Sequence, residues 1–403
     1  MLKSFAILLA ASMMWGADAK PKVRAITAFI DIDTTNYSTQ IGEAVRFLNS
    51  AREAYQHAGF EVETIRIATQ PFPRYTSGLT RAAAVAFLIK LDELSAKLGF
   101  LGSIGTAMIN DSDDAGPVDL LMEALPRVKL NASLVVAGED GIHWNAVRQS
   151  ARLIHALAQD SKEGQANFNF AAIAMLKPYG PFFPGAWHPG GGRTFSVGLE
   201  SANLVTDVLG RERDPARAEK ALAAALAEPL LAAEKIAMGA AKTSAWTYAG
   251  IDPTPAPLGD VSIGRAMEAF TGAPFGSSGT MTAAAIITRA VKAAPVKQVG
   301  YSGLMVPVLE DALLARRWAE GTYQIDSLLA YSAVCAGGLD TVPLPGDVGE
   351  ERLARIVGDV ATLAFKWNKP LAARLLPVPG KKAGDRTAFE DSRMANTTLQ
   401  AVK

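Results

Sequence analysis

The chain has 403 residues, 49 % of them hydrophobic and 20 % charged, with 40 basic and 40 acidic side chains and a formal net charge of zero. This balance argues against nucleic acid or an anionic membrane surface as the main partner. A single cysteine, Cys335, excludes an internal disulfide. The composition therefore favours a well-packed, enzyme-sized protein.

The first 19 residues have the pattern of a secretory signal peptide. Lys3 provides a positive charge, residues 5–15 form an apolar run, and Ala17-Asp18-Ala19 is a small-residue cleavage motif. The run is shorter than the roughly 20 residues that a membrane-spanning helix needs. We therefore predict cleavage after Ala19, a periplasmic or secreted mature protein, and no stable insertion into a membrane.

Strand and helix patterns alternate over the first half of the chain. Residues 23–32 are β-branched and apolar, which predicts a strand, and residues 40–57 have apolar positions at helical spacing. By the same criteria we predict strands at 60–68, 101–109, 132–137 and 167–176, and helices at 80–98, 118–125 and 143–159. Such alternation predicts a mainly parallel sheet or barrel with covering helices.

A loop rich in glycine, proline and aromatic residues, 177–193, opens the second half and is expected to cover a pocket. The alanine-rich helix predicted at 215–242 can pack inside the protein or against another subunit, so a homo-oligomer remains open. No linker divides residues 20–380, which predicts a single α/β domain, and the polar residues 381–403 are expected to be a frayed tail. Further helices are predicted at 200–209, 262–270, 280–293, 310–319, 324–331 and 348–367, and strands at 244–250, 296–301 and 372–377.

The segment 331–347 is the densest in residues with special conformations or chemistry. It contains Cys335, the pair Gly337-Gly338, Asp340 and Asp347. Because glycine permits positive φ and proline stiffens the chain, this segment is expected to hold a definite shape. Cys335 is a candidate nucleophile or acid–base group, and the two aspartates are candidates to orient it or to hold a metal.

An activated thiol usually needs a cationic neighbour, and none lies in this segment. His188 or Arg374 would have to approach Cys335 from elsewhere in the chain. The alternative interpretation of Cys335 is a buried, inert packing residue.

Other candidate groups lie on loops that precede helices. Gly279 and Thr280 begin a predicted helix, where they can bind an anion or simply cap the helix. His188 and Arg193 lie on a glycine-rich loop and can reach a carboxylate or phosphate, with Glu200 as a second candidate catalytic carboxylate. Further candidate contacts to a substrate are Asn203, Asp252, Tyr301, Ser302, Glu310 and Arg374.

Several common functional motifs are absent from the sequence. It contains no C-x-x-C, H-E-x-x-H, G-x-S-x-G, G-x-G-x-x-G or G-x-x-x-x-G-K-[ST] pattern. The four histidines are not spaced as a helical pair, which excludes a histidine-rich zinc site within one helix. The sequence therefore leaves metals and cofactors undetermined.

At several of these segments the chain resembles the bacterial and archaeal DUF711 family, also called UPF0210. The matching segments are 68–73 (ATQPFP), 195–203 (FSVGLESAN), 251–257 (IDPTPAP), 275–280 (FGSSGT), 301–305 (YSGLM), 331–347 and 369–374 (KPLAAR). The chain departs from the family pattern in its signal peptide and in Ala336-Gly337, where the family pattern has Gly-Thr.

This resemblance implies a ten-stranded barrel of pyruvate formate-lyase-like type around an inserted loop, with surrounding helices. By analogy with glycyl radical enzymes of that architecture, Cys335 would lie at the tip of a finger loop inside the barrel. The C-terminal glycyl radical motif is absent, so a glycyl radical enzyme is not expected. The resemblance implies no catalytic role for any residue.

These patterns predict an exported enzyme that acts on a small polar or anionic molecule, in a barrel pocket around Cys335 and nearby carboxylates. Lyase, hydrolase and isomerase chemistry all remain open. The alternative is a noncatalytic periplasmic small-molecule-binding protein in which Cys335 is a buried packing residue.

Overall fold

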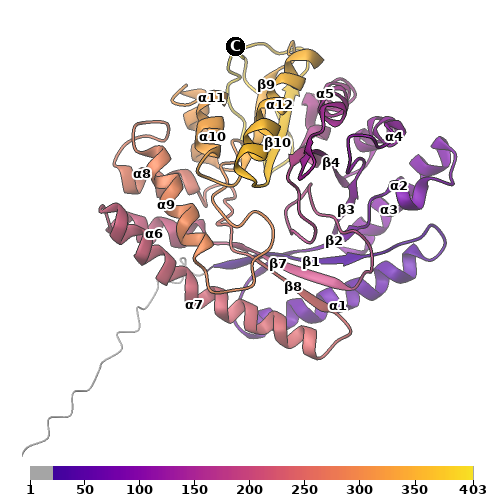
Figure 1. The fold of residues 1–403 in the computed structure, drawn as a ribbon, viewed down its shortest axis with the longest axis horizontal. Helices are drawn as coiled ribbons and strands as arrows, with labels where there is room; N and C mark the ends of the chain where they lie inside the picture. The colour runs from indigo at the N-terminus through magenta and orange to yellow at the C-terminus, as the bar shows by residue number, and fades with distance from the viewer. Residues whose placement is uncertain (1–20, 403) are drawn as a thin grey trace, which may run out of the picture.

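The computed structural model describes residues 21–402, which form a mixed α/β fold built on one large sheet (Figure 1). The predicted signal peptide lies outside these residues. Within them the sheet has ten strands in the order β8-β7-β1-β2-β3-β4-β6-β10-β9, with β5 paired to β4. The strands are β1 (Lys22–Ile30), β2 (Val62–Thr69), β3 (Leu101–Thr106), β4 (Asn131–Gly138), β5 (Gly141–Ile142), β6 (Phe170–Ala174), β7 (Thr194–Glu200), β8 (Thr247–Asp252), β9 (Gly338–Pro345) and β10 (Leu371–Val378).

The strands run in two directions. β1, β2, β3, β4 and β6 are mutually parallel and form the centre of the sheet. β7 is antiparallel to β1 and parallel to β8, while β10 is antiparallel to β6 and parallel to β9. The predicted α/β class with a parallel core is confirmed, but both flanks of the sheet run the opposite way.

The two edge strands, β8 and β9, are joined only indirectly in the described residues. Gln298 forms one parallel bridge with Ile251 of β8, and Pro307 forms one with Asp340 of β9. The segment 298–307 therefore runs from one edge of the sheet to the other. The predicted closed ten-stranded barrel is not confirmed, because no continuous ladder joins the two edge strands in the described residues.

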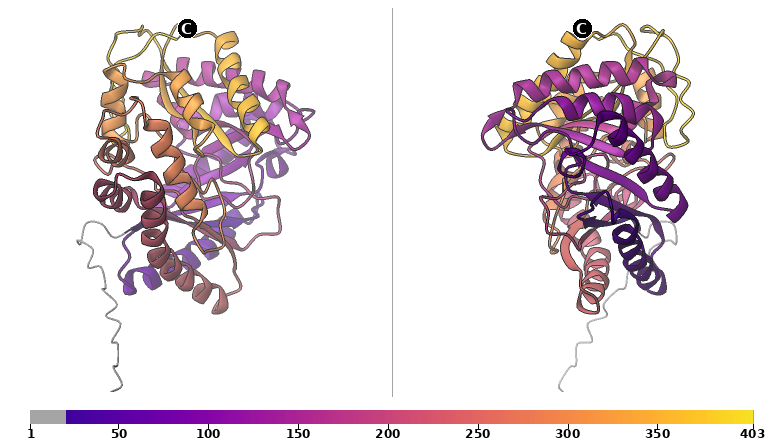
Figure 2. Two further views of the ribbon diagram at one scale, coloured as in Figure 1. Left: turned by 60° about the vertical axis from the view of Figure 1, so that its left-hand side comes forward. Right: turned by 90° about the vertical axis from the view of Figure 1, so that its right-hand side faces the viewer.

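Helices cover the outer face of the sheet (Figure 1, Figure 2). α5 (Trp144–Gln159) shows why: its buried residues include Val147, Ala151, Ile154 and Leu157, which repeat at helical spacing and face the core. The other helices are α1 (Tyr37–His57), α2 (Pro73–Thr76), α3 (Arg81–Leu98), α4 (Gly116–Ala124), α6 (Ala202–Arg211), α7 (Pro215–Lys242), α8 (Ile263–Thr271), α9 (Thr280–Lys292), α10 (Ala312–Ala319), α11 (Ile325–Ser332) and α12 (Glu350–Trp367), with short 3₁₀ helices η2 (Leu125–Arg127) and η3 (Lys162–Asn169).

The alanine-rich helix α7 packs one face inside the protein. Leu222, Leu226 and Leu230 are buried, and the helix contacts α1, α6, α9 and β8. This internal packing explains why these leucines are apolar without a second subunit. The predicted homo-oligomer therefore stays a prediction. No helix among residues 21–402 is long and apolar enough to cross a membrane.

The inner face of the sheet is covered by the glycine- and proline-rich loop 177–193. Phe183 and Ala186 pack against Phe29 of β1 and Ala68 of β2. Ser103 of β3 donates a hydrogen bond from Oγ to the carbonyl oxygen of Ala186 at 2.8 Å. The loop predicted to cover a pocket is therefore held against the strands from which a pocket would be built.

Two strands were missed or misplaced by sequence patterns. β7 ends at Glu200, where a helix was predicted to begin, and α6 starts only at Ala202. β9 occupies about half of the segment 331–347. Sequence patterns did not predict this strand, because Pro343 and Pro345 cannot donate hydrogen bonds to a ladder. β9 tolerates both prolines because it is an edge strand. Conversely, the strand predicted at 296–301 makes only the bridge at Gln298.

The C-terminal residues 381–402 are packed and not frayed, contrary to prediction. Phe389, Met394 and Leu399 are buried in a cluster with Phe168 and Leu376. The segment also folds back on itself through a bridge between residues 386 and 398. This packing brings the C-terminal segment to the edge of the cavity described next.

Candidate functional site

A cavity of about 160 Å³ lies at the inner face of the sheet. It is bounded by the amino-terminal ends of β1 and β2, the carboxyl ends of β7 and β8, and the inward side chains of β9 and β10. Phe182 and Phe183 of the covering loop contribute apolar surface. The charged residues that line it are Arg24, Glu63, Arg66, Asp252, Glu310, Asp340, Arg374 and Arg393.

The strand pairing is irregular beside two of the arginines that line this cavity. The pairing of β1 with β7 shifts between Val23 and Ala25, on either side of Arg24. The pairing of β10 with β9 shifts between Ala373 and Leu375, on either side of Arg374. At Arg24 the extra residue lies on β1, and because a β-bulge changes the direction in which a side chain points, Arg24 can reach inward. At Arg374 the extra residue lies on β9, and Arg374 points inward by regular alternation with Ala372 and Leu376.

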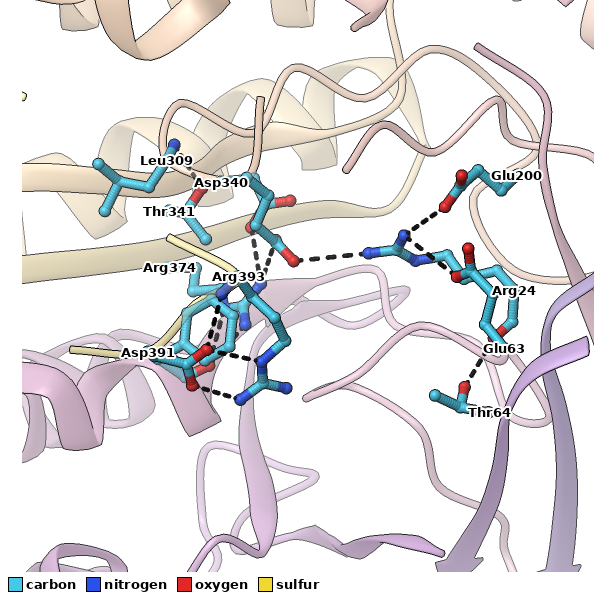
Figure 3. A network of polar contacts seen from close by, with 12 residues as sticks. Arg24, Glu63, Thr64, Glu200, Leu309, Asp340, Thr341, Arg374, Asp391 and Arg393 are labelled. Atoms are coloured by element: carbon cyan, nitrogen blue, oxygen red, sulfur yellow. Dashed lines mark hydrogen bonds and ion pairs between the residues drawn. The ribbon is translucent and has the colours of Figure 1, made fainter. Parts of the chain in front are cut away.

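The strand opposite Arg374 is distorted as well. Thr341, next to Asp340, has φ of +49°, which is unfavourable for a β-branched residue. Its Oγ1 accepts a hydrogen bond from the backbone N–H of Leu309 at 3.1 Å (Figure 3). Strained backbone of this kind persists where surrounding contacts hold it, and it often marks a functional site.

The two arginines join four carboxylates into a continuous chain of ion pairs. Arg24 contacts Glu200 at 3.0 Å, Glu63 at 3.9 Å and Glu310 at 3.6 Å. Arg374 Nη1 contacts Glu310 at 2.9 Å and Asp340 at 3.4 Å. Glu310 is therefore shared, and Figure 3 shows Arg24 extending from Glu200 and Glu63 towards the cluster around Asp340 and Arg374.

Arg374 is held on every side. Its Nε and Nη2 both donate to the carbonyl oxygen of Phe168, at 2.9 and 2.6 Å. Its guanidinium carbon lies 4.0 Å from the centre of the Phe168 ring, and that of Arg393 lies 4.5 Å from the same ring. Arg393 in turn donates to both carboxylate oxygens of Asp391. These contacts make Arg374 the structural centre of the site.

Two buried carboxyl groups of the site, Glu200 and Asp340, have raised pKa values. Burial, reinforced by the neighbouring Glu63 carboxyl, raises the pKa of Glu200 to about 7, although Arg24 acts in the opposite direction. Burial likewise raises the pKa of Asp340 to about 6; Arg374 opposes the rise and Glu310 adds to it. Glu200 also shares a side-chain hydrogen bond with Glu63. One proton held between two carboxyl groups is an arrangement that can act as acid or base.

The structure gathers some of the predicted site residues and separates others. Asp252, Glu310, Asp340 and Arg374 line the cavity, and Glu200 lies directly behind it, in contact with Arg24 and Glu63. The predicted residues that do not line it are Cys335, Asp347, His188, Arg193, Asn203, Gly279, Thr280, Tyr301 and Ser302.

Asp252 has a structural role. It accepts backbone hydrogen bonds from Thr254 at 3.0 Å and from Tyr301 and Ser302 at 3.1 Å each. These bonds tie the crossing segment 298–307 to the end of β8. Gly300, with φ of +71°, allows this approach, because a Cβ there would come within 2.2 Å of the Asp252 carboxylate.

Tyr301 lies at the border of the site. Its phenol oxygen is buried without a hydrogen-bond partner in the described residues, and burial raises its pKa well above the usual value. Its ring meets that of Phe182 edge-on, with centroids 4.9 Å apart. Tyr301 thus contributes packing behind the cavity wall.

Cys335 lies in the turn between α11 and β9 and is not at the tip of a loop inside the cavity. Its side chain is buried, 2 % exposed, and burial raises the pKa of the thiol. Its backbone N–H donates to Tyr331, and its carbonyl oxygen accepts a 2.7 Å hydrogen bond from Lys369 Nζ. A glycine is required three residues later, where the turn enters β9: Gly338 has φ of +78°, and a Cβ there would meet the Ala372 carbonyl at 2.3 Å.

We therefore expect Cys335 to be unreactive in the folded protein. At pH 8, iodoacetamide should label it at least 100-fold more slowly than in the urea-unfolded chain, because a buried, protonated thiol is both inaccessible and a poor nucleophile. Mass spectrometry of timed samples measures both rates. Rapid labelling with a lowered apparent pKa would restore the thiol as a candidate nucleophile.

His188 and Arg193 lie at the other end of β1. His188 Nε2 is 2.9 Å from the carbonyl oxygen of Ile30, whereas Arg24 is near the amino end of the same strand. Six residues of strand separate Arg24 from Ile30, which is roughly 20 Å. Arg193 pairs with Glu43 at 2.8 Å on the surface. These two residues hold the covering loop to the protein and do not reach the cavity.

The other separated residues have local roles or exposed positions. Thr280 Oγ1 accepts the backbone N–H of Gly276 at 3.1 Å, and Gly279 precedes α9 with φ of +98°, so this segment closes a turn before the helix. Asp347 and Asn203 are exposed, after β9 and on α6 respectively. Within residues 21–402 there is no group of three or more His, Cys, Asp or Glu side chains that could hold a metal ion.

Sequence patterns missed five residues at the site: Arg24, Glu63, Arg66, Phe168 and Arg393. The first three carried a detectable signal, because charged residues inside strands predicted to lie at the centre of a parallel sheet are unusual. Phe168 and Arg393 carried none, since each is brought to the site by the packing of an irregular segment.

The fold and the cavity define an α/β protein with linked arginines and carboxyl groups enclosed at the inner face of a mixed sheet. Within that class, residues 15–392 match the family model described as Uncharacterised ACR (DUF711), and the chain belongs to this family. The UPF0210 protein of Pyrobaculum arsenaticum is 31 % identical over 361 residues, covering 85 % of this chain and 79 % of the relative. That of Carboxydothermus hydrogenoformans is 28 % identical over 379 residues, covering 88 % and 82 %.

Proposed function

We propose that this protein is an enzyme that transfers protons to and from a small polar or anionic substrate by means of paired carboxyl groups. The observation that carries the proposal is the hydrogen-bonded pair of Glu63 and Glu200, with the pKa of Glu200 raised to about 7 by burial and by its partner. A carboxyl group that gains and loses a proton near the working pH is suited to general acid–base catalysis, which contributes typically 10²–10⁴-fold to a rate.

Each group has a distinct part in this proposal. Glu63 lines the cavity and exchanges the proton with the substrate, while the buried Glu200 stores it. Asp340, with a pKa of about 6 beside Glu310, is the second proton carrier on another wall. Arg24 and Arg374 hold both pairs in place through the ion pairs described above. Lyase, isomerase and hydrolase reactions all use such a pair of acid and base.

Cys335 has no part in the proposed chemistry, because its thiol is buried and does not line the cavity. We also propose closure of the barrel and export of the protein. The segment 298–307, bridged to both edges of the sheet, supports closure of the strands into a barrel of pyruvate formate-lyase-like type. The pattern of residues 1–19 supports export; N-terminal sequencing of the mature protein should then begin at Lys20, and a start at Met1 in the purified protein would contradict export.

The second candidate is a noncatalytic periplasmic binding protein with the same cavity. The burial of Cys335 agrees with a binding protein, in which the thiol is expected to be a packing residue. It differs from the enzyme in one respect: ligands bind and leave unchanged.

A turnover screen separates the two. Wild-type protein and Glu63→Gln are incubated in D₂O with mixtures of small organic acids and sugars, and NMR follows loss of substrate, new products and incorporation of deuterium. The enzyme proposal expects at least one compound to be converted or deuterated by the wild type and at least 100-fold more slowly by Glu63→Gln. Compounds that bind without any change would support the binding protein.

A further inference from the structure

Arg66 is a guanidinium that faces the cavity without an acidic partner. Its Nε donates to Thr64 Oγ1 at 3.1 Å, and its Nη1 donates to the carbonyl oxygen of Pro181 at 3.2 Å. Its guanidinium carbon lies 5.0 Å from the centre of the Phe183 ring. Nη2 has no hydrogen-bond partner in the described part of the chain, and Arg66 lines the cavity.

The carboxylates near Arg66 are already paired with other arginines. Glu200 and Glu310 contact Arg24, and Glu310 and Asp340 contact Arg374. None of these carboxylates lies close enough to Arg66 to form an ion pair in residues 21–402. Arg66 therefore has no ion-pair partner in these residues, and Glu310 and Glu63 act on its charge only at longer range.

A partly buried charge without an ion-pair partner is costly to maintain. Burial lowers the pKa of Arg66 to about 9, and the positive charge of Arg24 acts in the same direction, yet the guanidinium remains charged at neutral pH. Removing a charge from water without an ion-pair partner opposes folding. A ligand that brings a negative charge to Nη2 would remove this penalty and gain a charge-assisted hydrogen bond.

We propose that Arg66 binds an anionic group of the substrate, a carboxylate or a phosphate, and so orients the rest of the molecule towards Glu63. This inference rests on the proposed function and names its substrate class. Thr64, Pro181 and Phe183 hold the guanidinium in one orientation before the ligand arrives, which reduces the entropy lost on binding. Glu63 lies three residues before Arg66 on β2 and lines the same cavity, so an anion at Arg66 leaves the adjoining part of the substrate beside the proton carrier.

The experiment is isothermal titration calorimetry of the full mature protein with three probes: lactate, acetate and inorganic phosphate. We expect saturable binding with one site per chain for at least one probe, and at least tenfold weaker binding by Arg66→Met. Arg66→Lys, which keeps the charge but loses the planar fork, should be intermediate. Arg193→Met is the matched control, because Arg193 is paired on the surface away from the cavity, and it should bind as the wild type does. Which probes bind distinguishes carboxylate from phosphate.

A thermal unfolding series covers the case in which Arg66→Met alters the fold. If Arg66 lacks a counter-charge, Arg66→Met should be as stable as the wild type or more stable without anion, and only the wild type should gain melting temperature as the probe is added. No saturable binding by the wild type, or equal binding by Arg66→Met, would overturn the inference. Anion binding that depends on Arg66 without turnover of any compound would leave this inference standing and contradict the enzyme proposal instead.

Discussion

Replacing Arg374 with methionine is expected to lower the free energy of unfolding by about 3–5 kcal/mol at pH 7, the typical result of removing one partner from a buried ion pair. The variant leaves Glu310 and Asp340 without their shared cation at 2.9 and 3.4 Å. It also leaves the carbonyl oxygen of Phe168 without two donors. Urea denaturation followed by circular dichroism measures the change.

Arg393→Met is the matched control for this prediction. Arg393 lies over the same Phe168 ring, but it is partly exposed and pairs only with Asp391, two residues away. Its removal should cost less than about 1 kcal/mol, as for most exposed ion pairs. The destabilisation by Arg374→Met should also shrink as the pH is lowered to 4, because protonation neutralises Asp340, whose pKa is raised to about 6. A loss of similar size in both variants would contradict the central position that we assign to Arg374.

The second large effect is on the pH dependence of stability. The pKa of Glu200 is raised from the ordinary value of 4.5 to about 7 in the folded protein, which corresponds to about 3 kcal/mol. The folded state therefore binds this proton more tightly than the unfolded state. The stabilisation is fully present below about pH 4.5 and is lost as the pH rises through about 7. Glu200 should thus make the wild type about 2–3 kcal/mol less stable at pH 8 than at pH 5.

Glu200→Gln tests this contribution, because glutamine resembles the protonated carboxyl group in shape and charge. The variant should lack the loss between pH 5 and 8 and become more stable than the wild type at the upper end. Glu61→Gln is the control: Glu61 is an exposed neighbour whose partner is Lys22 on the surface. Denaturant midpoints at each pH give the comparison, and parallel curves for wild type and Glu200→Gln would mean that Glu200 titrates normally.

Sequence patterns were sufficient for the central part of the fold because that part follows from local periodicity. The parallel strands β1 to β4 and β6 are short apolar runs between amphipathic helices, and each was predicted close to its observed position. β9 and the packed C-terminal segment were not predicted, because their structure depends on tertiary contacts. Pro343 and Pro345 are compatible with a strand only at the edge of a sheet, and Phe389 becomes a core residue only beside Phe168.

The site was predicted in part for the same reason. Glu310, Asp340 and Arg374 were candidates from residue type and position near strand ends, and they do meet at the cavity. Cys335 was a candidate because it is the lone cysteine, but its side chain is buried as a packing residue. Arg24 was visible as a charged residue inside a predicted strand, but its inward direction could not be predicted, because the bulge that aims it arises from the pairing of β1 with β7. Register between strands distant in sequence is not encoded in local patterns.

The most direct test of the account is a ¹³C NMR titration of the Glu200 carboxyl carbon in glutamate-labelled protein, assigned with Glu200→Gln. We expect an apparent pKa of about 7. Glu63→Gln should lower that pKa, because it removes a neighbouring negative charge while Arg24 remains. A Glu200 carboxyl that titrates near the ordinary value of 4.5, unaffected by Glu63→Gln, would contradict the shared proton and with it the proposed acid–base chemistry.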